Sequence, residues 1–158
     1  MLKLLALTLG LCVGAFALAE DDAAPTSVAV EFARSMRAHD QLRLMLKGVA
    51  ENTVTIKGLV AAHGREQVEP VLKDEIERVA SSHDDEWTRN LALCYQTRFS
   101  EDELRVLTTD KQSSAYGQKL RNEMPAVGEA MQTRSQGLLT IAAQDVVVST
   151  FRHFSGNH

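Results

Sequence analysis

Cysteine is scarce in this 158-residue chain, which contains only Cys12 and Cys94. Cys12 falls in an apolar N-terminal segment that we expect to be removed, so Cys94 would remain alone and no intramolecular disulfide could form. The folded domain must then be stabilised by packing. Cys94 shares the spacing i, i+4, i+7, i+8 with Trp87, Leu91 and Tyr95. This pattern predicts a buried structural thiol rather than a reactive one.

Basic residues are also few. The chain has 17 Lys and Arg against 21 Asp and Glu. Loss of the N-terminal segment with Lys3 leaves 16 against 21, a net charge of −5. An acidic domain lacks the positive patch that attracts nucleic acid and the basic face that binds anionic lipid. The composition therefore argues against both kinds of partner.

Residues 1–19 have the pattern of a signal peptide. Lys3 supplies a basic start, an uncharged and mostly apolar run follows, and Ala17 and Ala19 mark a cleavage site. The apolar run of about 15 residues is shorter than the roughly 20 that a membrane-spanning helix needs. We therefore expect an exported protein, periplasmic or secreted after cleavage near Ala19, with no stable membrane anchor and a single helical domain over 20–158.

Hydrophobic periodicity is helical over nearly all of this domain. One apolar stripe runs from Leu42 to Val60 and predicts a single helix of about five turns that ends near His63 and Gly64. A second stripe covers Val68–Val79, where Pro70 must lie in the first turn or kink the helix. No alternating strand pattern is present. The sequence predicts an all-α, single-domain bundle of about six helices.

The middle of the chain is predicted to form turns and short helices. Ser81–Asp85 is interpreted as a turn that delivers acids to the N-terminus of the helix holding Trp87. A short helix is expected around residues 114–121. Pro125 is well placed to open the last helix, over about 125–152.

That last helix is expected to be long and very apolar. Its main face is formed by Val127, Met131, Leu138, Ala142 and Val146, and further apolar residues widen it. A helix that is apolar most of the way round is packed on several sides or shared with a partner. Core burial and a partner interface both remain open. A possible interface would lie on the face that holds Leu138, Ile141, Val148 and Phe151.

The sequence predicts that a helix begins at Ser100. Ser100 followed by Glu103 is a capping box, in which each side chain bonds the backbone N–H of the other residue. Phe99, directly before the cap, can staple against Leu104 in the first turn.

This segment and the one after it resemble a bacterial secreted-protein family known as domain of unknown function 2059. The resemblance rests on Phe99-Ser100-x-x-Glu103-Leu104, on Ser113-x-x-x-Gly117-x-Lys119, and on Pro125. The chain departs from the family pattern at Lys111-Gln112, where an aromatic pair is usual, and at Ala115, where Pro is usual. The resemblance implies export, and it implies no activity because the role of the family is not established. Ser100 and Glu103 are expected to cap a helix that Phe99 staples. Gly117 and Pro125 are expected to shape the connections around it, and Lys119 is expected to be solvated.

Chemistry-bearing motifs are few. His63 precedes Glu66 and Glu69, and His83 precedes Asp84–Glu86, but neither has the His-Glu-x-x-His spacing of a zinc site. Gly-x-Ser-x-Gly is absent, and Gly117 lacks the upstream strand and glycine of a phosphate loop. The sequence therefore predicts no cofactor, no metal and no catalytic residue.

The leading interpretation is an exported protein that acts by binding an unknown protein partner or a second copy of itself. The alternative is a carrier of a small apolar ligand within the bundle, and the second alternative is an enzyme whose residues meet only in space. A closed apolar pocket would favour a carrier. An exposed apolar patch of more than a few hundred Å² would favour an interaction module.

Overall fold

The computed structural model describes residues 24–110 and 115–156. The expected signal peptide and Ser113 lie outside these ranges. Within them the chain forms six helices and no strand, so the prediction of an all-α bundle is confirmed. The helices are α1 (Ser27–Ser35), α2 (Ala38–Glu51), α3 (Val54–His63), α4 (Arg65–Gln96), α5 (Glu101–Thr109) and α6 (Gly117–Ser155).

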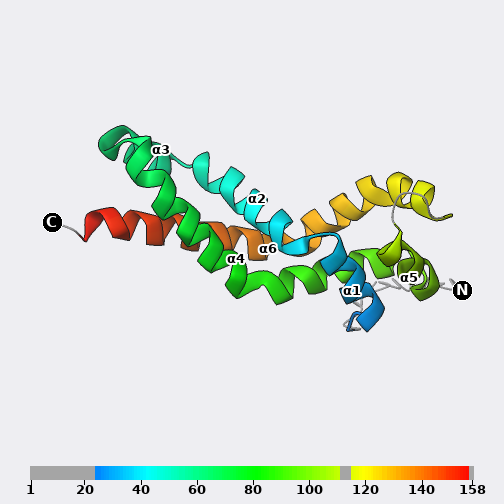
Figure 1. Ribbon diagram of the computed structural model, residues 1–158. Coiled ribbons are helices and arrows are strands. Elements are labelled where there is room, and N and C mark those ends of the chain that lie inside the picture. The colour runs from blue at the N-terminus through cyan, green and yellow to red at the C-terminus, as the bar shows by residue number, and fades with distance from the viewer. Residues whose placement is uncertain (1–23, 111–114, 157–158) are drawn as a thin grey trace, which may run out of the picture.

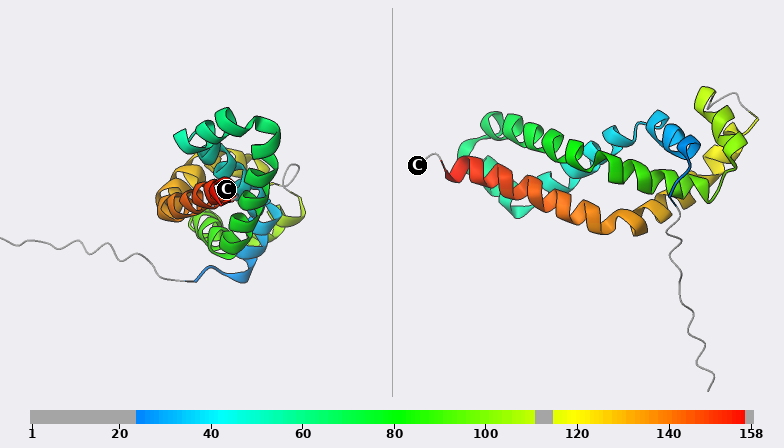
Figure 2. Two further views of the ribbon diagram at one scale, coloured as in Figure 1. Left: turned by 90° about the vertical axis from the view of Figure 1, so that its left-hand side faces the viewer. Right: turned by 90° about the horizontal axis from the view of Figure 1, so that it is seen from below.

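Two long antiparallel helices, α4 and α6, run side by side along the molecule (Figures 1 and 2). Helices α2 and α3 pack along this pair, whereas α1 and α5 lie together at the end opposite the C-terminus (Figure 1). Helix α4 contacts α1, α2, α3 and α6, so the core is arranged around it. Trp87 and Tyr95 of α4 are among the largest fully buried side chains, and the Tyr95 ring meets Phe32 edge-on at a centroid distance of 4.8 Å.

The prediction of a single helix from Leu42 to Val60 is wrong, because α2 ends at Glu51 and α3 begins at Val54. At the break, the Thr53 hydroxyl donates to the carbonyl of Ala50 (2.7 Å) and accepts from the N–H of Ile56 (3.3 Å). The Asn52 side chain donates to the carbonyl of Gly48 (2.8 Å). Such short polar side chains compete with helical backbone bonds and favour a new cap. The expected end at His63 is confirmed, and Gly64 follows with φ +84°.

The predicted turn at Ser81–Asp85 is also wrong, because α4 continues through it. The Ser82 hydroxyl donates to the carbonyl of Val79 (2.8 Å) within the helix. Val79 and Ala80 on one side of the segment and Trp87 on the other are buried, so one apolar face runs through the expected turn. Pro70 lies in the second turn of α4 rather than the first, and it has no N–H to give the carbonyl of Glu66.

Helix α6 replaces the two helices expected at 114–121 and 125–152. Pro125 lies inside α6 instead of opening it. The face of Val127, Met131, Leu138, Ala142 and Val146 is buried as predicted. The broader claim, that the helix is very apolar, is not confirmed. Exposed side chains flank the buried face, namely Gln132, Arg134, Gln136, Gln144 and Asp145. No helix in the described ranges has the length and apolar character needed to cross a membrane.

Candidate ligand-binding groove

A groove of about 610 Å³ lies between α2, α4 and α6. Four residues of α2 form one wall, Gln41, Met45, Gly48 and Val49. Three residues of α4 also line it, Trp87, Leu91 and Tyr95. The other wall is one face of α6 between Met124 and Thr140, which at 1.5 Å per residue extends about 24 Å. It is formed by Met124, Val127, Gly128, Met131, Gln132, Ser135, Gln136, Leu139 and Thr140. We call this feature the methionine groove.

The methionine groove is uncharged and rich in flexible sulfur-containing side chains. None of the described residues that line it is Asp, Glu, Lys, Arg or His, although 24% of the chain is charged. Three of the five methionines of the chain line it, Met45, Met124 and Met131. Met45 is 46% exposed and Met124 39% exposed, so the groove opens to solvent. Methionine adapts its shape readily and is common on surfaces that accept varied apolar ligands.

Two glycines add to the width of the methionine groove. Gly48 lies on the α2 wall and Gly128 on the α6 wall, both inside helices. A Cβ atom built on either residue would meet no other heavy atom within 4 Å. The space in front of both residues is therefore open.

Three hydrogen-bond donors along the methionine groove have no oxygen as acceptor. The Trp87 indole N–H is buried and has no hydrogen-bond partner among the described residues. The Tyr95 hydroxyl donates to Sδ of Met124 at 3.7 Å. The Ser135 hydroxyl donates to Sδ of Met131 at 3.4 Å and accepts from the side chain of Asn90 at 3.1 Å. Thioether sulfur is a weak acceptor, so all three donors are poorly satisfied.

The ionisable groups in and behind the groove floor are held neutral. Burial, and to a smaller extent the neighbouring Cys94, raises the pKa of Tyr95 to about 12. Burial also raises the pKa of the Cys94 thiol, although Arg134 and Arg98 partly offset this. Cys94 is buried, as the sequence predicted, and its thiol is free. A protonated buried thiol is a poor nucleophile.

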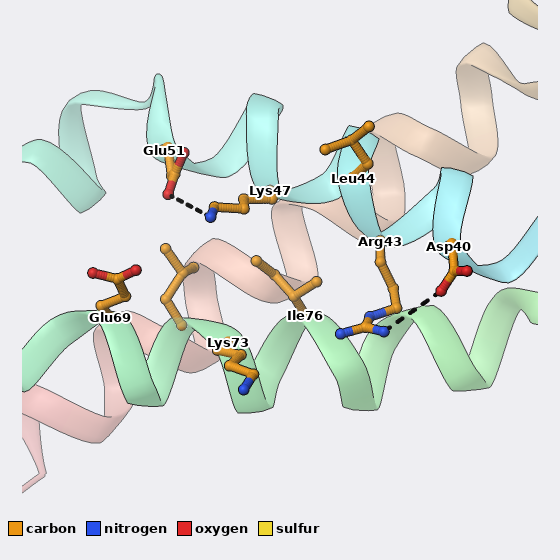
Figure 3. A pocket seen from close by; sticks show the side chains of 9 residues that line it. Asp40, Arg43, Leu44, Lys47, Glu51, Glu69, Lys73 and Ile76 are labelled. Atoms are coloured by element: carbon orange, nitrogen blue, oxygen red, sulfur yellow. Dashed lines mark ion pairs between the residues drawn. The ribbon is translucent and has the colours of Figure 1, made fainter.

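A second hollow, about 300 Å³ in volume, lies between α2 and α4 and has a different chemistry. Figure 3 shows charged side chains from both helices around an apolar floor that includes Ile76. Several of these charges are already paired, with Lys47 3.8 Å from Glu51 and Arg43 3.7 Å from Asp40 (Figure 3). This second hollow is smaller than the methionine groove, and most of the charged side chains around it already form ion pairs.

The residues behind the family resemblance form a joint between α5 and α6. The capping box is present: the Ser100 N–H donates to Oε2 of Glu103 (2.9 Å) and the Glu103 N–H donates to the Ser100 hydroxyl (3.3 Å). Lys119 was expected to be solvated, and its side chain is 39% exposed, but it is also paired. Its Nζ donates to both carboxylate oxygens of Glu103, at 2.8 and 2.7 Å, and lies 4.8 Å from the centre of the Phe99 ring.

The remaining motif residues lie near this joint or along α6. Phe99 and Leu104 are both buried, as a staple requires. Gly117 is the first residue of α6 and is buried, whereas Pro125 lies two turns further along the helix. None of these residues lines the methionine groove. The motif therefore marks a structural connection and not the groove.

The four residues expected at an interface differ in how far they are exposed to solvent. Leu138 is 8% exposed and belongs to the core, which separates it from the other three. Ile141 is 64% exposed and Phe151 47% exposed, while Val148 is half-buried. The face that was considered for an interface is thus split between core and surface.

The acids and histidines do not assemble into a catalytic cluster in the groove. His39 Nδ1 lies 3.2 Å from Asp84 and its Nε2 lies 3.3 Å from Glu77, a link between α2 and α4 that the sequence did not suggest. The His63 ring packs against Phe154 at a centroid distance of 4.8 Å. Over residues 24–110 and 115–156, no three His, Cys, Asp or Glu side chains converge as metal ligands would.

Comparison with known proteins gives no relative. A scan of protein-family models, a search of characterised proteins and a search of solved structures each found no match to this chain. The resemblance to the secreted family stays a prediction that rests on the motif residues alone.

Sequence reasoning missed the methionine groove because it assigned part of the groove wall to the core. Met45 and Val49 fit the apolar stripe of α2, but they are 46% and 43% exposed. The available signal was the pair of glycines, since Gly48 and Gly128 each interrupt an apolar helical segment where Ala would suit the helix better.

Proposed function

We propose that the protein binds a small apolar ligand in the methionine groove. The observation that carries this proposal is a 610 Å³ concave surface whose described lining has no charge. Small-molecule sites are typically concave, mostly apolar and about 300–1,000 Å³ in volume, with a few polar groups that orient the ligand. The proposal develops the carrier interpretation of the sequence, with one difference: the groove is open to solvent, whereas a carrier was expected to have a closed pocket. The predicted leader would put this binding in the periplasm or outside the cell.

The glycines support the proposal on energetic grounds. Glycine inside a helix is less stable than alanine by roughly 0.5–1 kcal/mol, and a methyl group at Gly48 or Gly128 would meet no neighbour. The chain therefore forgoes stability at two positions that face the same groove, as it also does at Gly58 and Gly137 outside the groove. Proteins commonly accept such a loss where function needs the space.

The direct test uses N-phenyl-1-naphthylamine, an uncharged probe that fluoresces in apolar surroundings. We expect saturable binding to the full chain. Gly128→Leu and Gly48→Leu should each weaken this binding at least tenfold, because the new side chain occupies the groove. The matched control is Gly137→Leu, a glycine of α6 with equally open space that does not line the groove.

The outcomes separate clearly. Probe binding that Gly137→Leu leaves intact and Gly128→Leu abolishes supports the proposal. Absence of saturable binding contradicts it, and so does binding that all three variants leave unchanged. Native mass spectrometry of protein isolated from its own compartment then gives the mass of any ligand retained.

A second candidate function is docking of an amphipathic helix from a partner protein. The exposure of Met45, Val49 and Met124 favours it, as does a groove wall of about 24 Å, the length of roughly 16 helical residues. Native mass spectrometry distinguishes the two candidates. A bound species of a few hundred daltons indicates a small ligand, whereas a co-isolated polypeptide that crosslinks to groove residues indicates a partner helix.

A further inference from the structure

The donors of the methionine groove narrow the class of ligand. We infer that the ligand carries a neutral oxygen acceptor, such as a ketone, ester or amide carbonyl, on its apolar body. Trp87, Tyr95 and Ser135 lie at separate points along the groove, and each is a candidate donor to this oxygen. The inference rests on the proposed function and adds a chemical requirement to it.

The Trp87 indole is the first ground for the inference. It is 2% exposed, it lines the groove, and its N–H has no hydrogen-bond partner among the described residues. A buried donor without an acceptor is costly, and native proteins rarely leave one unpaired without a functional reason. Indole N–H is a donor only, so its acceptor must come from outside the described residues, and a ligand in the groove can supply it.

Tyr95 and Ser135 supply the second ground. Both hydroxyls donate to methionine sulfur, at 3.7 and 3.4 Å. Sulfur is the weaker acceptor, so a carbonyl oxygen that enters the groove would displace it. The groove then offers three donors, contributed by α4 and α6, that can orient a polar head while the apolar body lies against methionine and leucine side chains.

Because none of the described lining residues is charged, the groove favours a ligand without charge. A carboxylate transferred from water into an uncharged apolar site loses its hydration with no cation to replace it. A carbonyl of a ketone, ester or amide carries no such penalty. Neutral acceptors are therefore preferred over fatty-acid anions.

Access to the indole nitrogen requires side-chain movement. The nitrogen is covered, so the ligand oxygen reaches it when groove side chains shift. Met124 and Met131, which accept the other two donors, are unbranched and re-pack readily. Where the ligand oxygen takes the Tyr95 or the Ser135 hydroxyl, it should release the methionine that now accepts from that hydroxyl.

The test uses two probes of nearly the same shape, butyrophenone and butylbenzene, which differ by a carbonyl in place of a methylene. Each competes with N-phenyl-1-naphthylamine for the full chain. At least one of Tyr95→Phe and Ser135→Ala, the variant that removes the donor used by the carbonyl, should weaken butyrophenone roughly threefold to tenfold, the loss of one net hydrogen bond. Butylbenzene should change less than about twofold. Tyr116→Phe is the matched control, because Tyr116 does not line the groove.

A second readout needs no variant. Trp87 is the only tryptophan of the chain, so its indole N–H gives a single proton–nitrogen correlation in a nuclear magnetic resonance spectrum. Butyrophenone should move this peak downfield as the N–H gains an oxygen acceptor, and butylbenzene should not.

Each failure has a separate meaning. If the two probes respond alike to the variants and to the indole measurement, the carbonyl requirement is overturned while the proposed function stands. The same holds if the anion 4-phenylbutanoate binds more tightly than butyrophenone. If N-phenyl-1-naphthylamine itself does not bind, the proposed function is lost and the inference with it.

Discussion

At Glu103 one carboxylate serves two helices. Its oxygens accept the backbone N–H of Ser100, which closes the start of α5, and the ammonium of Lys119 near the start of α6. The hydrogen bond from Lys119, and after it the bond from the Ser100 backbone, lower the pKa of Glu103. The cap and the ion pair therefore depend on the same ionised group.

Loss of the Ser100 hydroxyl should destabilise the protein. Ser100→Ala leaves the Glu103 N–H without its acceptor at the start of α5, and we expect the free energy of unfolding to fall by about 1 kcal/mol. Chemical denaturation measures the change. Ser100→Thr, which keeps a capping hydroxyl, is the control and should stay near the wild-type value. A Ser100→Ala protein as stable as wild type would show that the cap contributes nothing.

Acid should selectively weaken the joint at Glu103. Because the pKa of Glu103 in the folded protein lies below its ordinary value of 4.5, the ionised group stabilises the protein above about that pH, and this contribution is lost as pH falls through the folded pKa. Glu103→Gln keeps a capping side chain but removes the charge. The stability difference between wild type and Glu103→Gln should be largest near neutral pH and should shrink well below 4.5 in acid denaturation curves. A difference independent of pH would contradict the ionic role.

Local residue patterns were predictable and contacts distant in sequence were not. The two residues of the capping box are three positions apart, and the box could be predicted from Ser100 and Glu103 alone. The bond from Lys119 spans 16 residues, so the sequence offered no reason to pair it. The groove donors are still more remote, because Ser135 and Trp87 meet only after α4 and α6 have packed.

At the scale of elements, helix type was predictable and helix boundaries were not. The apolar stripe of Val68, Leu72, Ile76 and Val79 continues on the same helix face to Trp87. Half-buried His83 lies between, four residues from both Val79 and Trp87. That shared face indicated one continuous helix, but the polar run from Ser81 masked it. At Thr53 the sequence pattern suggested one helix where the structure has two. The apolar spacing continues past Thr53, but hydrogen bonds between its side chain and the backbone separate α2 from α3.

The continuity of α4 leads to a test at Ser82. In a continuous helix, Ser82→Pro removes a backbone bond and clashes with the preceding turn, so we expect a loss of about 3 kcal/mol or more. A turn at this place would tolerate proline. Ser82→Ala is the control and should be nearly neutral. Circular dichroism and urea denaturation measure helix content and stability, and an undamaged Ser82→Pro protein would argue for a turn.

At the scale of the whole molecule, the two sides of α6 should respond differently to charge. Leu138→Glu puts a carboxylate into the core, and we expect a loss of at least about 3 kcal/mol. Ile141→Glu lies at a position that is 64% exposed, so stability should change by no more than about 0.5 kcal/mol. Thermal denaturation measures both.

The same pair of variants tests the homodimer that the sequence left open. Analytical ultracentrifugation should give the same mass for wild type and Ile141→Glu. A wild-type mass twice that of Ile141→Glu would instead establish a dimer through this face of α6.

The length of α6 has a consequence for how the protein behaves in solution. Its 39 residues extend about 58 Å, whereas a spherical domain of about 130 residues would be only about 36 Å across. A molecule so elongated meets more friction than a sphere of equal mass and tumbles slowly end over end. It will elute early from a size-exclusion column and resemble a larger species, so elution volume alone would mistake a single chain for a pair.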